Sequence, residues 1–125
     1  MLSGRVHPAE AYRQVEFDAR VHGASPQELA SICFEQLTGA LGTAIHAQET
    51  GDPVLRSRSL SRAVSSLLAL EMGLSGDDPV VMAMRDLYGR ARSSILSCAV
   101  QFDADRLDHI RRDFIDIHAA LSGSN

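Results

Sequence analysis

The chain has 125 residues and a mass of 13.5 kDa, which suits one domain and excludes two full hydrophobic cores. With 45% hydrophobic and 22% charged residues, the composition is globular and excludes a disordered chain. All 12 basic residues are arginine, against 16 acidic residues, and the net charge of -4 at pH 7 disfavours a nucleic-acid partner.

Apolar runs in the chain are short. The longest runs from Val80 to Met84, far below the about 20 residues of a membrane-spanning helix, and residues 1–8 lack the apolar centre of a secretion signal. We therefore expect a cytoplasmic protein without membrane insertion. Cys33 and Cys98 lie in different segments without the CxxC spacing of metal or redox sites, so we expect reduced, buried thiols.

Residues 1–24 have the least regular apolar pattern. Their apolar positions fit either a short helix or an extended strap, and we predict an N-terminal strap that precedes a single domain over residues 25–125. The apolar positions are Pro8, Ala11, Tyr12, Val15 and Phe17.

A capping box marks the start of the first long helix. Ser25 can cap the helix, Pro26 suits its first position, and Glu28 stands three residues after the cap. Apolar residues then recur at helical spacing until Gly51, which predicts a helix to about Glu49. They are Leu29, Ile32, Cys33, Leu37, Ala40, Leu41, Ala44 and Ile45.

Two further helices begin with an aspartate followed by a proline, at 52–53 and at 78–79. The first is expected to end in the Gly73 to Gly76 region, and the second continues as an apolar stripe to Phe102. The stripes consist of Leu60, Ala63, Val64, Leu67, Leu70 and Leu74, and of Val80, Met84, Leu87, Tyr88, Ala91, Ile95, Cys98, Ala99 and Phe102.

A last helix can be capped by either Asp103 or Asp105 and precedes a polar tail over residues 122–125. Its apolar positions are Leu107, Ile110, Phe114, Ile117 and Leu121. No apolar and polar alternation supports strands. Four amphipathic helices with short connections predict an all-α fold, an antiparallel four-helix bundle.

No catalytic, cofactor or metal site stands out in the sequence. The Glu-x-x-His pairs of di-iron bundles are absent, and Asp105, His109 and His118 fit a solvated helix face better than a metal site. Neither cysteine occupies a glycine-rich turn, and no phosphate-binding glycine loop is present. We therefore expect a binding protein and not an enzyme.

Two other functions remain open at this point. His46 lies within a helix away from the apolar stripe, so a histidine phosphotransfer bundle is an alternative, although the lysine and glycine typical beside such a phosphoacceptor are missing. A bundle with a structural or dimerising role is the other.

A second apolar row runs along the two middle helices. Leu68 and Met72 follow Ser61 and Ser65 at helical spacing on one, and the other carries a similar row. These rows line a groove for a partner helix or strand, or they complete a wide core. The row on the other helix is Met82, Gly89, Ser93, Leu96 and Val100.

Arginines accompany these rows. Arg56, Arg58 and Arg62 begin the first of the two helices with no acidic residue between Val54 and Ser66. Arginines at 85, 90 and 92 follow on the second. They form either a site for a carboxylate-bearing partner or an ordinary solvated face.

The order of motifs resembles the FliS family of flagellin-specific export chaperones. An Ala-Tyr segment at 11–14, a helix start at 23–29 similar to the family's T-A-S-P-x-E-L, and Cys33-Phe34-Glu35 carry the resemblance. The segments 67–71 and 87–88 and the aspartate start at 103 agree with it. The chain departs from the family in lacking a Gly-Gly pair before residue 79 and any tryptophan.

The resemblance implies a cytoplasmic helical bundle that holds the C-terminal segment of flagellin, prevents early polymerisation and delivers flagellin to the export apparatus. It also implies that the chaperone's own N-terminal segment covers part of the client site. Tyr12 comes from the family motif, and the other candidates come from helical spacing; self-association stays open. The candidates are Tyr12 and Val15 for the strap, Leu68, Met72, Met82, Leu96 and Val100 for the groove, and Arg56, Arg62 and Arg85 for polar anchoring.

Overall fold

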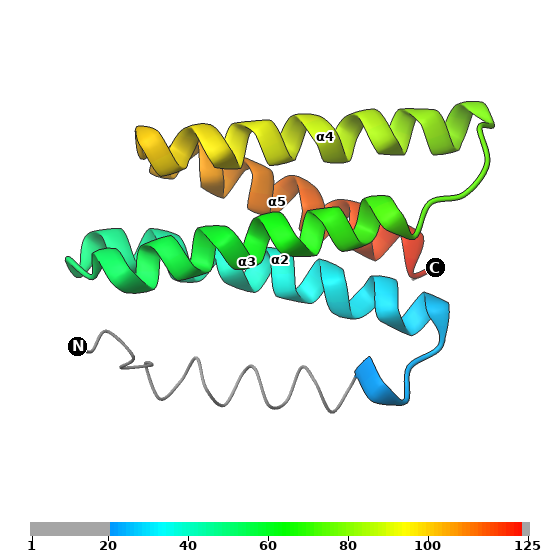
Figure 1. Cartoon of the computed structure of the whole chain (residues 1–125), viewed down its shortest axis with the longest axis horizontal. Coiled ribbons are helices and arrows are strands. Elements are labelled where there is room, and N and C mark those ends of the chain that lie inside the picture. Colours follow the sequence, from blue (N-terminus) through cyan, green and yellow to red (C-terminus); the bar gives the residue numbers. More distant parts are fainter. Residues whose placement is uncertain (1–20, 124–125) are drawn as a thin grey trace.

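The computed structural model describes residues 21–123 and is helical over most of that range (Figure 1). Four helices alternate in direction, and each packs against the next along the chain. The first also packs against the last, which confirms the predicted all-α antiparallel bundle. The helices are α2 (Pro26–Glu49), α3 (Pro53–Met72), α4 (Pro79–Val100) and α5 (Ala104–Leu121).

Side-chain caps fix where each helix begins. The Ser25 hydroxyl accepts a hydrogen bond from the Glu28 amide at 3.2 Å, and the Glu28 carboxylate accepts one from the Ser25 amide at 2.9 Å. These bonds hold the pKa of the Glu28 carboxyl below its ordinary value. Aspartates 52, 78 and 103 cap the other helices. Asp103, not Asp105, therefore begins α5, because its carboxylate accepts from the Arg106 amide at 3.1 Å.

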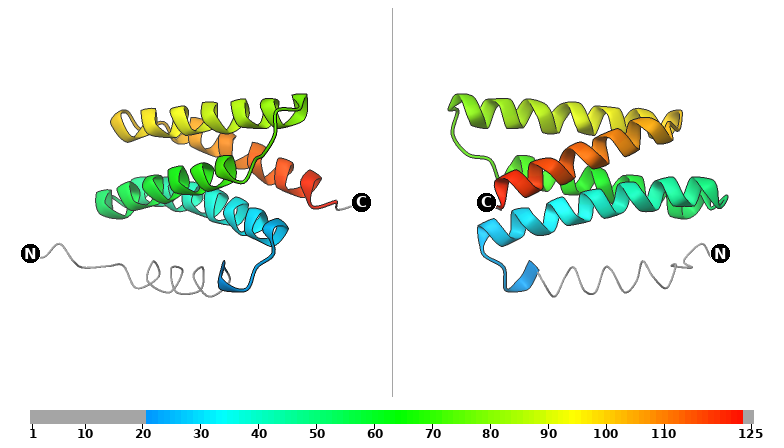
Figure 2. Two further views of the ribbon diagram at one scale, coloured as in Figure 1. Left: turned by 45° about the vertical axis from the view of Figure 1, so that its right-hand side comes forward. Right: turned by 180° about the vertical axis from the view of Figure 1, so that it is seen from behind.

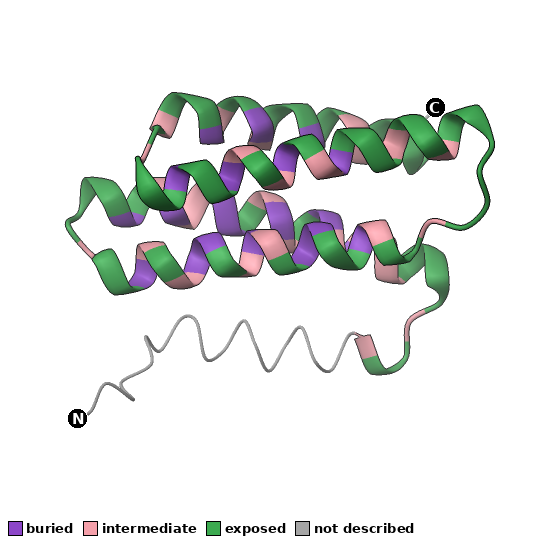
Figure 3. Ribbon diagram, turned by 45° about the horizontal axis from the view of Figure 1, so that its top comes forward, coloured by how far each residue is buried: buried purple, intermediate pink, exposed green. Residues whose placement is uncertain are grey.

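The core is built around an aromatic cluster that joins three helices. The ring of Phe34 on α2 lies 6.4 Å from Tyr88 on α4 and 6.1 Å from Phe114 on α5. His118 stacks on Phe34 at 5.0 Å, and its Nε2 lies 2.7 Å from the Ser31 hydroxyl. Buried residues follow the inner faces of the helices, while their outer faces are exposed (Figure 3). Most residues of the predicted stripes therefore lie in the core or against it, with Phe34 as an addition.

The end of α4 differs from the sequence prediction. The apolar stripe suggests helix as far as Phe102, whereas α4 ends at Val100 and Phe102 lies in the turn before α5. There the Arg56 guanidinium lies 5.9 Å from the centre of the Phe102 ring. Phe102 thus packs against the core, with the Arg56 side chain of α3 over its ring, instead of extending α4.

Helices α4 and α5 diverge from the turn that joins them (Figure 2). As a result, the first turns of α4 are not covered by α5. Four residues of the predicted stripes are exposed: Val80 (67%) and Leu87 (36%) in the first half of α4, Ala99 near its end, and Leu121 (56%) at the end of α5. Over residues 21–123, no helix is both long and apolar enough to span a bilayer.

A candidate partner-binding face on helices α3 and α4

Eight large apolar side chains are exposed along α3 and α4. Five of them belong to the row predicted from helical spacing, and we call these five the α3–α4 face. Large apolar side chains gathered on one surface are typical of protein-binding sites. The sequence left open whether this row completes the core, and in the structure it lies outside the core. The exposed fractions are 44% for Leu68, 85% for Met72, 57% for Met82, 50% for Leu96 and 92% for Val100.

Helical geometry separates this face from the core. Leu67 is fully buried, and Leu68, one residue and about 100° further round α3, points outward. On α4, fully buried Ile95 and half-exposed Leu96 are related in the same way. Each helix therefore contributes one apolar side to the bundle and a second apolar side to the surface.

A groove between α3 and α4, with a volume of about 430 Å³, lies at the end where α3 begins. Leu60 and Ile95 are buried at its base, and Leu96 and Ala99 line its α4 side. Three serines on α3, at positions 57, 61 and 65, line the other side, and we call it the serine groove. Small side chains of this kind let the backbone of a partner approach closely.

A second, wider groove of about 750 Å³ lies at the opposite end, where α4 begins. We call it the arginine groove. It contains Met82, Gly89 and Ser93 of the predicted row together with charged residues from both helices. These charged residues are Glu71, Arg85, Asp86, Arg90 and Arg92.

A two-pronged ion pair joins α3 to α4 inside the arginine groove. The Arg92 Nε and Nη2 atoms donate to the two carboxylate oxygens of Glu71 at 2.9 and 2.8 Å. The hydrogen bonds from Arg92 hold the pKa of Glu71 below its ordinary value of 4.5, and the charges of Arg92 and Arg85 contribute in the same direction. The pair fixes the spacing of the two helices beneath the α3–α4 face.

The three arginines predicted as anchors lie in different surroundings. Arg56 lines the serine groove but already donates to the Gln48 side chain and covers Phe102. Arg85 lines the arginine groove, where its Nη2 lies 3.5 Å from the Gly76 carbonyl. Arg62 lines neither groove. Arg85 is therefore the predicted anchor best placed beside the α3–α4 face.

The predicted strap residues, Tyr12 and Val15, lie outside the described residues. Sequence reasoning also left Val80 out of the candidate set, because its position in the stripe predicted a core residue. Its exposure next to Met82 arises from the divergence of α4 and α5, which no local sequence pattern reports.

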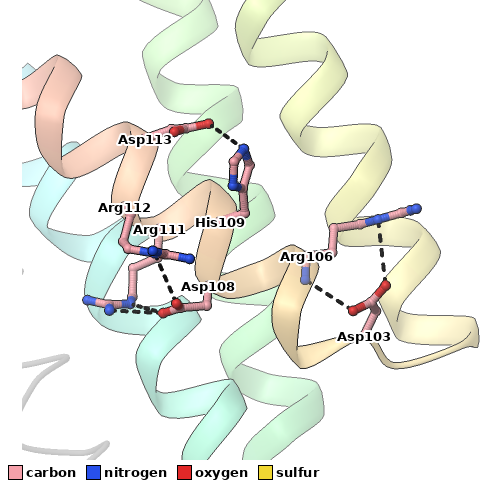
Figure 4. A network of polar contacts seen from close by, with 7 residues as sticks. All are labelled: Asp103, Arg106, Asp108, His109, Arg111, Arg112 and Asp113. Atoms are coloured by element: carbon pink, nitrogen blue, oxygen red, sulfur yellow. Dashed lines mark hydrogen bonds and ion pairs between the residues drawn. The ribbon is translucent and has the colours of Figure 1, made fainter.

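Several charged side chains of α5 pair within that helix (Figure 4). Asp108 accepts from Arg111 at 2.9 Å and from Arg112 at 3.1 Å, and His109 lies 3.4 Å from Asp113. Pairs with i,i+3 and i,i+4 spacing are ordinary for a solvated helix face. This agrees with the solvated face expected for Asp105 and His109, whereas the expectation is wrong for His118, which stacks on Phe34 in the core and contacts the Ser31 hydroxyl.

The potential metal ligands and the two cysteines lie apart from one another in the described part of the chain. No three His, Cys, Asp or Glu side chains of residues 21–123 gather as a metal site. Both cysteines are free: Cys98 is buried, whereas Cys33 is only half-buried, and burial raises the pKa of the Cys33 thiol. The expectation of two buried thiols therefore holds for Cys98 and is only partly met for Cys33.

Comparison with known proteins finds matches over most of the chain. A family model described as "Flagellar protein FliS" matches residues 8–122, a range that includes all four helices. The flagellar secretion chaperone FliS of Salmonella typhimurium (strain LT2) is 27% identical over 104 residues, covering 81% of this chain and 77% of the relative.

Proposed function

The chain belongs to the FliS family, and from this premise we propose that it holds the C-terminal segment of flagellin on the α3–α4 face before export. Membership in this family makes the chain a flagellar secretion chaperone and not an enzyme. The client segment, the binding face and the cytoplasm as the place of action belong to the proposal. Delivery of the loaded client to the flagellar export apparatus completes it.

The observation that carries the proposal is the exposure of five large apolar side chains on a bundle whose core is complete without them. A disordered client segment can fold as an amphipathic helix against such a surface, with apolar anchors at helical spacing. Ordering the segment costs about 2–5 kcal/mol of the gross interaction energy, so binding stays reversible. Reversibility is what a chaperone that must release its client requires.

The grooves at the two ends of this face suit such a client. The serine groove gives a helix backbone room to approach, and the methionines beside the arginine groove adapt to side chains of different shape. A long surface of this kind suits an extended segment better than a compact ligand.

The phosphotransfer alternative is not favoured. His46 is exposed in the last turn of α2, which meets only the simplest requirement of a phosphoacceptor. The family model, which describes a flagellar protein, matches residues 8–122 and so includes the whole bundle. No specific observation favours a purely structural role either.

We propose in addition that Tyr12 and Val15 belong to a strap that covers part of the client site when no client is bound. The support is the Ala-Tyr motif at 11–12 within the family match over residues 8–122. Such a strap keeps exposed apolar surface from self-associating before a client arrives.

Calorimetric titration of the full chain with the C-terminal segment of flagellin from the same organism tests the function. We expect one-to-one binding with a negative heat-capacity change, because apolar surface is buried as the segment folds. A scrambled peptide of identical composition is the control. Absence of binding, or equal binding of the scrambled peptide, would contradict the proposal.

A further inference from the structure

The arginine groove contains one arginine without a carboxylate partner among the described residues. Arg90 pairs with Asp86 at 2.9 Å, and Arg92 pairs with Glu71 at 2.8 Å. Arg85 donates to the neutral carbonyl of Gly76 at 3.5 Å, and its charge also acts on the Glu71 carboxylate without a direct ion pair. Three arginines and two acids line the groove, so its net charge is +1 on a chain whose net charge is -4.

The position of Arg85 relates this charge to the α3–α4 face. Arg85 stands three residues after Met82, so the two side chains share one side of α4, and both line the arginine groove. Apolar side chains of a bound segment that pack on Met82 thus bring the segment's next polar group to the guanidinium. An anionic group there meets a cation that makes no ion-pair contact with a carboxylate among the described residues and that offers a planar, two-pronged donor.

We propose that Arg85 binds the terminal α-carboxylate of the client segment. This inference rests on the proposed function, because a C-terminal segment carries this carboxylate whatever its side chains are. Met82 packs against the last apolar side chain of the client. The client then has a defined direction, with its end in the arginine groove and its preceding residues towards the serine groove.

The test is a thermodynamic cycle in which the charge of Arg85 and the charge of the peptide's α-carboxylate are removed separately and together. Wild-type protein and Arg85→Gln are titrated with the flagellin C-terminal peptide, either as free acid or as C-terminal amide. For an exposed ion pair, each change alone is expected to weaken binding about twofold to fivefold. Both changes together are expected to weaken binding no more than one does, because they remove the same interaction.

Two controls separate this interaction from other charge effects. Arg112→Gln removes the same charge from α5, where Arg112 pairs with Asp108, and is expected to leave the affinity for both peptides as in wild type. A free-acid peptide with its Asp and Glu side chains replaced by Asn and Gln is expected to retain the full effect of Arg85→Gln. Thermal unfolding by circular dichroism checks that both variants are folded.

Three results would overturn the inference. If Arg85→Gln lowers the affinity for the free-acid and the amide peptide equally, the α-carboxylate is not the partner of Arg85. If Arg85→Gln no longer lowers the affinity for the peptide with neutralised side chains, the partner of Arg85 is an acidic side chain. An amide that binds as tightly as the acid excludes the pair altogether. Absence of any binding to wild type instead refutes the proposed function, and this inference with it.

Discussion

At the scale of single residues, adjacent positions in the chain have opposite roles. Leu67 is fully buried between helices, whereas Leu68 is 44% exposed on the α3–α4 face. The two side chains are chemically identical, so substitutions at these sites compare core packing with surface binding directly.

Leu67→Ala is expected to destabilise the bundle by about 2–5 kcal/mol, because it removes buried methyl groups and leaves a cavity. Leu68→Ala is expected to cost about 1 kcal/mol or less, since much of that side chain is already in water. Urea unfolding of both variants measures the difference. Equal destabilisation would show that Leu68 belongs to the core.

The Glu71 and Arg92 pair predicts a pH-dependent contribution to stability. Because the folded-state pKa of Glu71 is lowered below its ordinary 4.5, the contribution is complete above that value and is lost as pH falls through the lowered pKa. Wild type is therefore expected to be more stable than Glu71→Gln at pH 7, with a difference that shrinks towards pH 3. Urea unfolding at both pH values tests this, and a pH-independent difference would contradict it.

At the scale of the helices, the start signals carry most of the local information. Asp78 accepts hydrogen bonds from the amides of Val80 and Val81 at 2.9 and 3.1 Å and thereby begins α4. Among the described residues, no such bond is made by the neighbouring Asp77, which has the same charge and is also exposed. Comparing substitutions of Asp77 and Asp78 therefore separates the contribution of capping to stability from the contribution of charge.

Asp78→Ala is expected to destabilise the protein by about 1 kcal/mol through loss of the cap. Asp77→Ala removes an equal charge and is expected to change stability by less than about 0.5 kcal/mol. Thermal or urea unfolding measures both. If the two variants lose the same stability, the capping role of Asp78 is wrong.

The helix starts could be predicted from the sequence, because their signals are local. The residue pairs Ser25-Pro26, Asp52-Pro53 and Asp78-Pro79 place three helix starts correctly, because capping and proline geometry act within a few residues. The end of α4 and the exposure of Val80 were not predictable in this way. Both depend on how α4 is seated against α3 and α5, a tertiary arrangement without a local pattern.

The candidate site was predictable to a similar extent. Helical spacing placed Leu68 and Leu96 on one face, and the structure exposes both. Spacing did not distinguish Arg85 from Arg56, because the difference lies in partners on other elements, namely Gln48 at the end of α2 and Phe102 in the turn before α5. Charge alone was therefore a poor guide to which arginine is available.

At the scale of the whole molecule, client and strap are expected to compete for the same surface. Tyr12→Ala is expected to leave the bundle folded and to raise client affinity, because the strap no longer occupies part of the site. Titration with the flagellin C-terminal peptide measures the affinity, and circular dichroism checks the fold. An unchanged affinity would show that Tyr12 does not cover the client site.

The α3–α4 face is proposed to hold the client, and a loss of apolar contacts there tests this directly. The most direct measurement is calorimetric titration of the double variant Leu68→Ser/Leu96→Ser with the flagellin C-terminal peptide. Ile115→Ser is the matched control, since Ile115 is 43% exposed but lies on α5.

We expect the double variant to bind at least about tenfold more weakly than wild type, because two apolar contacts of about 1 kcal/mol or more each are lost. Ile115→Ser is expected to bind as wild type does. Wild-type affinity in a folded double variant, or an equal loss in Ile115→Ser, would contradict the assignment of the client to this face.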